Sequence, residues 1–284
     1  MSVRIATFNI ENLMRRFDFS GFRNELNIDR SLLLYDTRDE RQYRELETAR
    51  MMALADDVRQ HSALAIADTK ADIICLQEVD NIEVLKAFEF GYLFKMVGSG
   101  YRQKFMVEGN DSRGIDVAVM MKEETRDGQP IECVKVTSHA GLTFEELDLY
   151  SDGVALLDIK PNEKIFRRDC LEVELRIGGR PLTLFVTHLK SMGGPRNGMD
   201  GRQATLPVRV AETKAIRHVV EQRFGVNGTA HGQWLICGDM NDYYEKIEIR
   251  DGADGGFDFV PVEDANSALN VFLADGFAEN LVGR

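Results

Sequence analysis

The stretch CLEVELRIGGRPLTLFVTHLKS, residues 170–191, decides the fold class of this 284-residue chain. Apolar residues between 171 and 177 alternate with charged ones, which is the pattern of a half-buried strand. Gly178 and Gly179 follow, and the apolar run 182–186 comes next, so the stretch predicts a β-hairpin. A hairpin requires antiparallel pairing, which argues against a purely parallel sheet.

Similar strand-like runs recur along the chain, and two segments carry apolar residues at the helical spacing of three and four. The predicted strands are 3–10, 72–77, 93–97, 115–121, 132–136, 170–177, 182–188 and 234–237. The predicted helices cover about 39–68 and 203–224. We find no internal repeat and no clear domain boundary, so residues 1–284 are predicted to form a single domain.

Composition places the chain among ordinary globular proteins, with 44% hydrophobic and 29% charged residues. No apolar window is long enough to cross a bilayer and no signal peptide is recognisable, so we expect a cytoplasmic protein without membrane contact. The four cysteines are scattered through apolar runs, which favours reduced thiols over disulfides or zinc. A formal net charge of −12 argues against sequence-independent coating of nucleic acid.

Four of the predicted strands end in compact polar sets. The strand 3–10 ends with Asn9, the second strand is followed by Glu78, and two later strands end with His188 and with Asp239 and Asn241. Asn, Asp and Gly favour turns, so any single set is typical of ordinary turn chemistry. Four sets together favour a shared site, provided that the strand ends lie at one edge of the fold.

The residue types in these sets indicate metal-assisted phosphate chemistry. Apart from the histidine, they offer a metal only oxygen, which suits Mg²⁺ or Mn²⁺ better than zinc. Such a metal polarises a phosphoryl oxygen and offsets charge on the leaving group. Asp239 can orient or deprotonate an attacking water, while His188 and an arginine hold the non-bridging oxygens in the transition state. The sequence contains no G-x-S-x-G elbow, which argues against a serine hydrolase.

The ordered motifs TFNIEN, CLQEVD, VTHLKS and GDMND resemble the signature of the endonuclease/exonuclease/phosphatase superfamily. They span residues 3–242, most of the chain, in the order typical of that family. The resemblance implies an α/β fold, a four-layer α/β/β/α sandwich of two mixed, largely antiparallel sheets with helices on the outside. It also implies divalent-metal-dependent hydrolysis of a phosphoester by direct attack of water, on either a nucleic acid or a small phosphate ester.

The resemblance also implies roles for individual residues. Glu78 is expected to be the principal metal ligand with Asn9 assisting, and Asp239 to position the nucleophilic water beside the metal. Asn241 is expected to bind phosphate or metal, and His188 to contact the phosphate.

Two further positions carry less defined roles. Arg168 is expected at the phosphate, with Arg167 as the alternative. Asp116 is expected to bind substrate, or else to be a strand-end carboxylate bonded to backbone.

One part of the family pattern is missing. Family members close with an Asp-His pair near the C-terminus, but none of the five histidines here follows an Asp, and none lies beyond Asn241. Truncation and natural loss of catalysis are the two explanations. We expect truncation, with absent last strands, weakened activity and a sheet edge through which copies can associate, although no obligate protein partner is evident. The alternative function is a non-catalytic module that binds phosphate and metal.

Overall fold

A computed structural model describes residues 2–13, 38–42, 56–98, 100–111, 113–194, 198–226, 229–251 and 256–281. The helices formed by these residues are all too short or too polar to span a bilayer. Residues 43–55, which fall inside the predicted helix 39–68, lie outside the described residues.

The first sheet has the strand order β1-β2-β4-β3 and mixes parallel with antiparallel pairing. Its strands are β1 (Ile5–Leu13), β2 (Ile73–Val79), β3 (Gln103–Met106) and β4 (Asp116–Met121). β1 and β2 run parallel, with Asn9 opposite Gln77, so their polar ends meet at one edge of the sheet. β4 is antiparallel to β2 and begins at the same edge, because Asp116 pairs with Val79.

The second sheet has the order β5-β6-β7-β8 and is also mixed. Its strands are β5 (Ile131–Ser138), β6 (Cys170–Ile177), β7 (Arg180–His188) and β8 (Trp234–Asp239). The predicted hairpin is confirmed: β6 pairs antiparallel with β7 across Gly178 and Gly179, whose φ angles of 54° and 82° suit a tight turn. β7 and β8 run parallel with His188 opposite Asp239, so a second pair of polar strand ends forms one edge.

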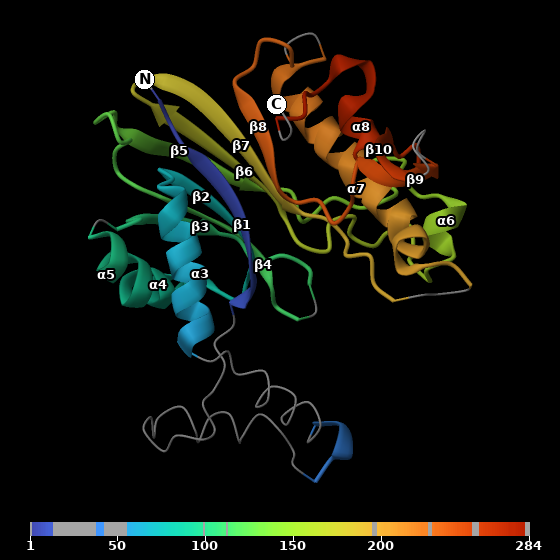
Figure 1. Cartoon of the computed structure of the whole chain (residues 1–284), viewed down its shortest axis with the longest axis horizontal. Helices are drawn as coiled ribbons and strands as arrows, with labels where there is room; N and C mark the ends of the chain where they lie inside the picture. The colour runs from blue at the N-terminus through green and yellow to red at the C-terminus, as the bar shows by residue number, and fades with distance from the viewer. Residues whose placement is uncertain are drawn as a thin grey trace.

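The two sheets face each other and helices cover both outer faces (Figure 1). Apolar side chains of both sheets, such as Cys75, Val119 and Leu171, form the core between them. α3 (Asp56–Thr69) and α4 (Ile82–Phe88) pack on the outside of the first sheet. α7 (Gly201–Phe224) packs on the outside of the second sheet. The four-layer sandwich of mixed, largely antiparallel sheets is therefore confirmed, as is the helix predicted at 203–224.

The remaining elements are short. They are the π-helix η1 (Glu89–Leu93), α5 (Phe94–Val97), α6 (Asp152–Ala155), the strands β9 (Glu245–Asp251) and β10 (Phe257–Glu263), α8 (Asn270–Leu273) and the 3₁₀ turn η2 (Ala274–Gly276). β9 and β10 pair antiparallel in a separate two-stranded sheet, and residues 252–255 between them lie outside the described residues.

The strand predicted at 93–97 is wrong, because this segment continues the helix that begins with α4. Its apolar residues fit a helix as well as a strand: Leu93 is buried, whereas Phe94 and Val97 are exposed. A short apolar run does not separate the two patterns. Near the end of the described residues, Ala268 precedes α8 and Phe272 lies within it, and both are buried.

Candidate active site

The polar ends of strands from both sheets meet around His188. Its Nε2 atom lies 3.9 Å from Glu78 Oε1 at the end of β2 and 3.7 Å from Asp239 Oδ2 at the end of β8. The imidazole side chain is 2% exposed, against 14% for Glu78 and 30% for Asp239. The histidine therefore lies beneath two carboxylates that are more open to solvent.

Asn9 connects the first sheet directly to Asp239. Its Nδ2 donates a 2.9 Å hydrogen bond to Asp239 Oδ2, and its Oδ1 accepts a hydrogen bond from the backbone N–H of Glu11. Both ends of the amide are thus engaged, and the amide fixes the orientation of the Asp239 carboxylate. Of the residues expected at the site, Asn9, Glu78, His188 and Asp239 come together.

The loop after β8 is shaped by close approach to β7. A Cβ on Gly238 would collide with the backbone carbonyl of Thr187, and Gly238 has a φ of 146°. Only glycine fits here, which explains the first residue of GDMND. Asn241 then turns back with φ 47°, its N–H donates to Asp239 Oδ1, and its Nδ2 donates to Leu189 O over 3.0 Å.

Glu78 also has an uncommon backbone conformation. Its φ is 67°, and the pairing of β2 with β4 shifts register between Leu76 and Val79. A non-glycine residue in the left-handed region costs about 1–3 kcal/mol and occurs preferentially at functional sites. The irregularity directs the Glu78 side chain toward His188 instead of along the regular strand alternation.

The imidazole of His188 is neutral at physiological pH. Burial is the main reason that the pKa of His188 falls from 6.5 to about 4, and the charge of Arg168 lowers it further against the opposing charge of Asp239. Its Nδ1 atom is buried and has no hydrogen-bond partner among the described residues. A neutral ring at this position can donate one hydrogen bond without adding positive charge.

Arg168, whose charge acts on His188, is 2% exposed. Its Nη1 donates to Leu189 O over 3.3 Å, and its Nε forms a 2.9 Å ion pair with Asp111 Oδ2 that is not aligned as a hydrogen bond. The guanidinium is therefore held by protein groups. Arg167, the alternative, is more exposed and lies 3.5 Å from Glu163.

The sequence reasoning missed a second arginine, Arg113. Its side chain is 51% exposed, and its Nε and Nη2 lie 3.2 and 3.3 Å from Asp111. Burial raises the pKa of Asp111, but hydrogen bonds from Arg113 and the charge of Arg168 outweigh it, so this pKa is lowered. One carboxylate thus joins a buried and an exposed guanidinium. The only signal in the sequence is the charged loop DSRGID before β4.

Asp116, at the start of β4, is 2% exposed and lies beside Gly109. Burial raises the pKa of Asp116 to about 6, and the nearby carboxylates of Asp111 and Asp169 raise it further. Asp116 thus lies near the carboxylates of Asp111 and Asp169, with its Oδ1 unpartnered among the described residues.

Asp242, the last residue of GDMND, lies away from His188. Its carboxylate is fully buried, accepts a 2.7 Å hydrogen bond from Arg202 Nε, and lies 3.5 Å from the buried Arg209. Asp242 Oδ2 also accepts from the backbone N–H of Ala268. Asp242 therefore anchors the site loop to α7 and to the segment before α8, a role that the motif alone did not reveal.

The chemistry of these side chains fits a hard divalent cation. Glu78 and Asp239 present carboxylate oxygens to the same region, and the neutral imidazole between them adds no positive charge. Mg²⁺ is commonly held by one or two carboxylates together with substrate phosphate and water. Among the described residues, no three His, Cys, Asp or Glu side chains form a metal-binding cluster.

Comparison with known proteins identifies the family of this arrangement. The model of the Endonuclease/Exonuclease/phosphatase family matches residues 6–280. No curated protein sequence matches the chain.

Solved structures are similar at low identity. They include truncated Caenorhabditis elegans TDP2 (16% identity, TM-score 0.38, 64% of this chain and 54% of that one) and a β-hairpin deletion mutant of Staphylococcus aureus beta toxin (11%, 0.42, 84% and 67%). Sphingomyelinase C from Streptomyces griseocarneus is a third (16%, 0.39, 64% and 57%). The present chain spans between about half and two thirds of the length of these proteins.

Proposed function

The chain belongs to the endonuclease/exonuclease/phosphatase family, and from this premise we propose that it hydrolyses a phosphoester with a divalent metal, by direct attack of water. The observation that supports this activity most directly is the convergence of Glu78 and Asp239 on His188 Nε2, at 3.9 and 3.7 Å. A carboxylate pair beside a neutral imidazole provides a base, a metal ligand and a hydrogen-bond donor in one place.

We propose Mg²⁺ or Mn²⁺ as the metal, held by Glu78 and by the outer side of Asp239. When bound, such an ion polarises a phosphoryl oxygen and offsets the charge of the leaving group. Asn9 keeps Asp239 oriented through its 2.9 Å hydrogen bond. We propose that Asn241, fixed by its hydrogen bonds to Leu189 O and Asp239, contacts the metal or the phosphate through its amide.

The protein groups act on water and phosphate in separate ways. Asp239 is 30% exposed and accepts a proton from a water at the mouth of the site. His188 donates a hydrogen bond from Nε2 to a non-bridging phosphate oxygen, which strengthens as charge develops there. The buried guanidinium of Arg168 supplies fixed positive charge near the phosphate. The more exposed guanidinium of Arg113 contacts the phosphate oxygens that face solvent.

The substrate class follows from a panel of model esters. We would measure hydrolysis of bis-p-nitrophenyl phosphate, p-nitrophenyl phosphate and single-stranded DNA with Mg²⁺ or Mn²⁺, with and without EDTA. Glu78→Gln and Asp239→Asn should each lower kcat by at least about 100-fold. Glu83→Gln is the matched control, since Glu83 is 71% exposed and pairs with Lys86 on α4.

Equal turnover in EDTA, or wild-type rates in both site variants, would contradict the metal mechanism. A protein that hydrolyses none of these esters but binds them in a manner lost in Glu78→Gln would instead establish the non-catalytic binding module.

A further inference from the structure

A pocket lies at the opposite end of the first sheet from His188. It has a volume of about 590 Å³ and is lined by residues after α3, before β2, between α5 and β3, and after β4. Asp72, which lines it, precedes β2, whereas Glu78 ends that strand. At about 3.3 Å per residue, roughly 20 Å of strand separates the two places.

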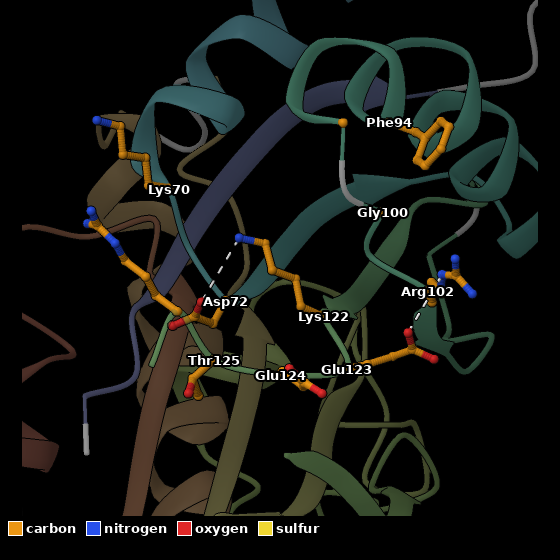
Figure 2. A pocket seen from close by; sticks show the side chains of 11 residues that line it. Lys70, Asp72, Phe94, Gly100, Arg102, Lys122, Glu123, Glu124 and Thr125 are labelled. Atoms are coloured by element: carbon orange, nitrogen blue, oxygen red, sulfur yellow. Dashed lines mark ion pairs between the residues drawn. The ribbon is translucent and has the colours of Figure 1, made fainter. Parts of the chain in front are cut away.

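Lys122 reaches into the middle of this pocket (Figure 2). Its Nζ lies 4.0 Å from Asp72 Oδ1 and 5.4 Å from the centre of the Tyr101 ring. Neither contact is a hydrogen bond, and no described residue accepts one from this ammonium group. The side chain is 21% exposed, so a partly buried cation is positioned with its three N–H donors available.

The Asp72 carboxylate, in turn, has one oxygen that accepts no hydrogen bond from a described residue. Its Oδ2 accepts a 2.9 Å hydrogen bond from the backbone N–H of Arg4, but its Oδ1 is buried and has no partner among the described residues. Figure 2 shows this carboxylate at the pocket wall, facing Lys122. A buried carboxylate oxygen that accepts no hydrogen bond is costly even with an ammonium group 4.0 Å away, and a donor from a bound molecule would satisfy it.

Positive charge gathers around these two groups. Lys70 and Arg126 line the pocket with exposed side chains and form no ion pair within the described residues. Arg102 lies 3.7 Å from Glu123, with both side chains largely exposed. In all, four cationic and three anionic side chains line the pocket, so its lining carries a small net positive charge in a chain whose net charge is −12.

We propose that this pocket binds a small phosphate ester with a free hydroxyl group, such as a sugar phosphate. Lys70 follows α3, whereas Lys122 and Arg126 both lie in the segment after β4, and the three side chains supply donors for the phosphate oxygens. The hydroxyl donates to Asp72 Oδ1 and satisfies the buried oxygen. The binding is separate from the hydrolysis proposed at His188 and does not depend on it.

The whole chain is titrated separately with ribose 5-phosphate, inorganic phosphate and ribose. Binding is measured from the chemical shifts of the backbone amides by NMR. Gly98 and Gly100 line the pocket, and Gly238 reports on the region of His188. We expect saturable shifts at Gly98 and Gly100, with affinity in the order ribose 5-phosphate, phosphate, ribose. Shifts confined to Gly238, or no saturable shift at Gly98 and Gly100, would overturn the proposal whatever the activity of the site.

Substitutions test which side chains donate hydrogen bonds to the phosphate. Lys122→Met and Arg126→Gln should each weaken ribose 5-phosphate about tenfold, because each removes a charge-assisted hydrogen bond. Lys86→Met is the matched control: Lys86 is exposed on α4 and pairs with Glu83. Unchanged affinity in both pocket variants would overturn the assignment. The NMR spectrum of each variant shows directly whether it is folded.

A last variant distinguishes the proposed contact with the ligand hydroxyl from the contacts with its phosphate. Asp72→Asn removes negative charge beside Lys122, so it should tighten inorganic phosphate while reducing the preference for ribose 5-phosphate over phosphate. An unchanged preference would show that Asp72 does not receive the hydroxyl and would overturn that contact.

Discussion

Asn9 Nδ2 donates a 2.9 Å hydrogen bond to Asp239 Oδ2, across 230 positions of sequence and between the two sheets of the sandwich. Asn9 lies on β1 of the first sheet and Asp239 ends β8 of the second. This hydrogen bond thus connects the two sheets and also orients the proposed catalytic carboxylate of Asp239. Its removal should affect chemistry more than folding.

Asn9→Ala should lower phosphoesterase kcat, and the affinity for Mn²⁺, by about 10- to 100-fold, because groups that orient a metal ligand have effects of this size. Kinetics with a model diester and calorimetric titration of Mn²⁺ measure the two quantities. Asn266→Ala, at an exposed position, is the control. Wild-type kcat and Mn²⁺ affinity in Asn9→Ala would contradict the orienting role.

Gly238→Ala should destabilise the protein by about 3 kcal/mol or more, since the new Cβ would meet the backbone carbonyl of Thr187, which cannot move without breaking the pairing of β7 with β8. Urea denaturation measures the loss. Gly141→Ala has open space around its Cβ and should change the free energy of unfolding by less than about 0.5 kcal/mol. Equal stability of the two variants would be inconsistent with this close approach.

Asp242→Asn should lower the free energy of unfolding by about 3 kcal/mol, because it removes the carboxylate that pairs with the buried Arg209 and one of the two carboxylates that pair with Arg202. Glu248→Gln, on the exposed β9, removes a carboxylate that also contacts two cations, Lys246 and Arg250. This control should change stability by less than about 0.5 kcal/mol. Both are measured by chemical denaturation, and similar effects would argue against an anchoring role for Asp242.

Glu212→Gln should alter how stability depends on pH. Burial raises the pKa of Glu212 to about 7, although N–H groups of Lys190 and Arg167 lower it in part. Between the unfolded value of 4.5 and about 7 the native state therefore holds a proton that the unfolded state has lost. This contribution to stability is complete below pH 4.5 and is lost as the pH rises through 7.

The neutral glutamine does not titrate, so the melting temperature of Glu212→Gln relative to wild type should rise between pH 5 and pH 8. The free-energy difference over this window is on the order of 3 kcal/mol. Thermal melts at matched ionic strength measure it. A difference that is constant or falls with pH would show that the Glu212 carboxyl is ionised throughout.

Arg113→Ala should raise KM for a phosphodiester about tenfold with little change in melting temperature, because the half-exposed guanidinium contributes little to folding. Arg250→Ala is the control, with a 55% exposed arginine that also pairs with a carboxylate two residues away. A drop in kcat without a change in KM would place Arg113 in the transition state instead of in substrate binding.

Much of the fold follows from local patterns in the sequence. The alternation before Gly178 and the apolar runs that end at His188 and Asp239 predict strands correctly, since successive side chains of a strand point to opposite faces whatever the rest of the chain does. The same reasoning failed at 93–97, where the short apolar run belongs to a helix. It also missed β3, whose four residues are only partly buried and lack a clear alternation.

The sequence by itself determined which strands end in polar groups, and hence that Asn9, Glu78, His188 and Asp239 are available for a site. Only the tertiary structure decided which atom contacts which: Asn9 with Asp239, Arg113 with Arg168 through Asp111, and Asp242 with Arg209. Strand periodicity is a property of adjacent residues. Ion pairs and hydrogen bonds between distant segments depend on how two sheets and a helix pack, and on the burial that this packing imposes.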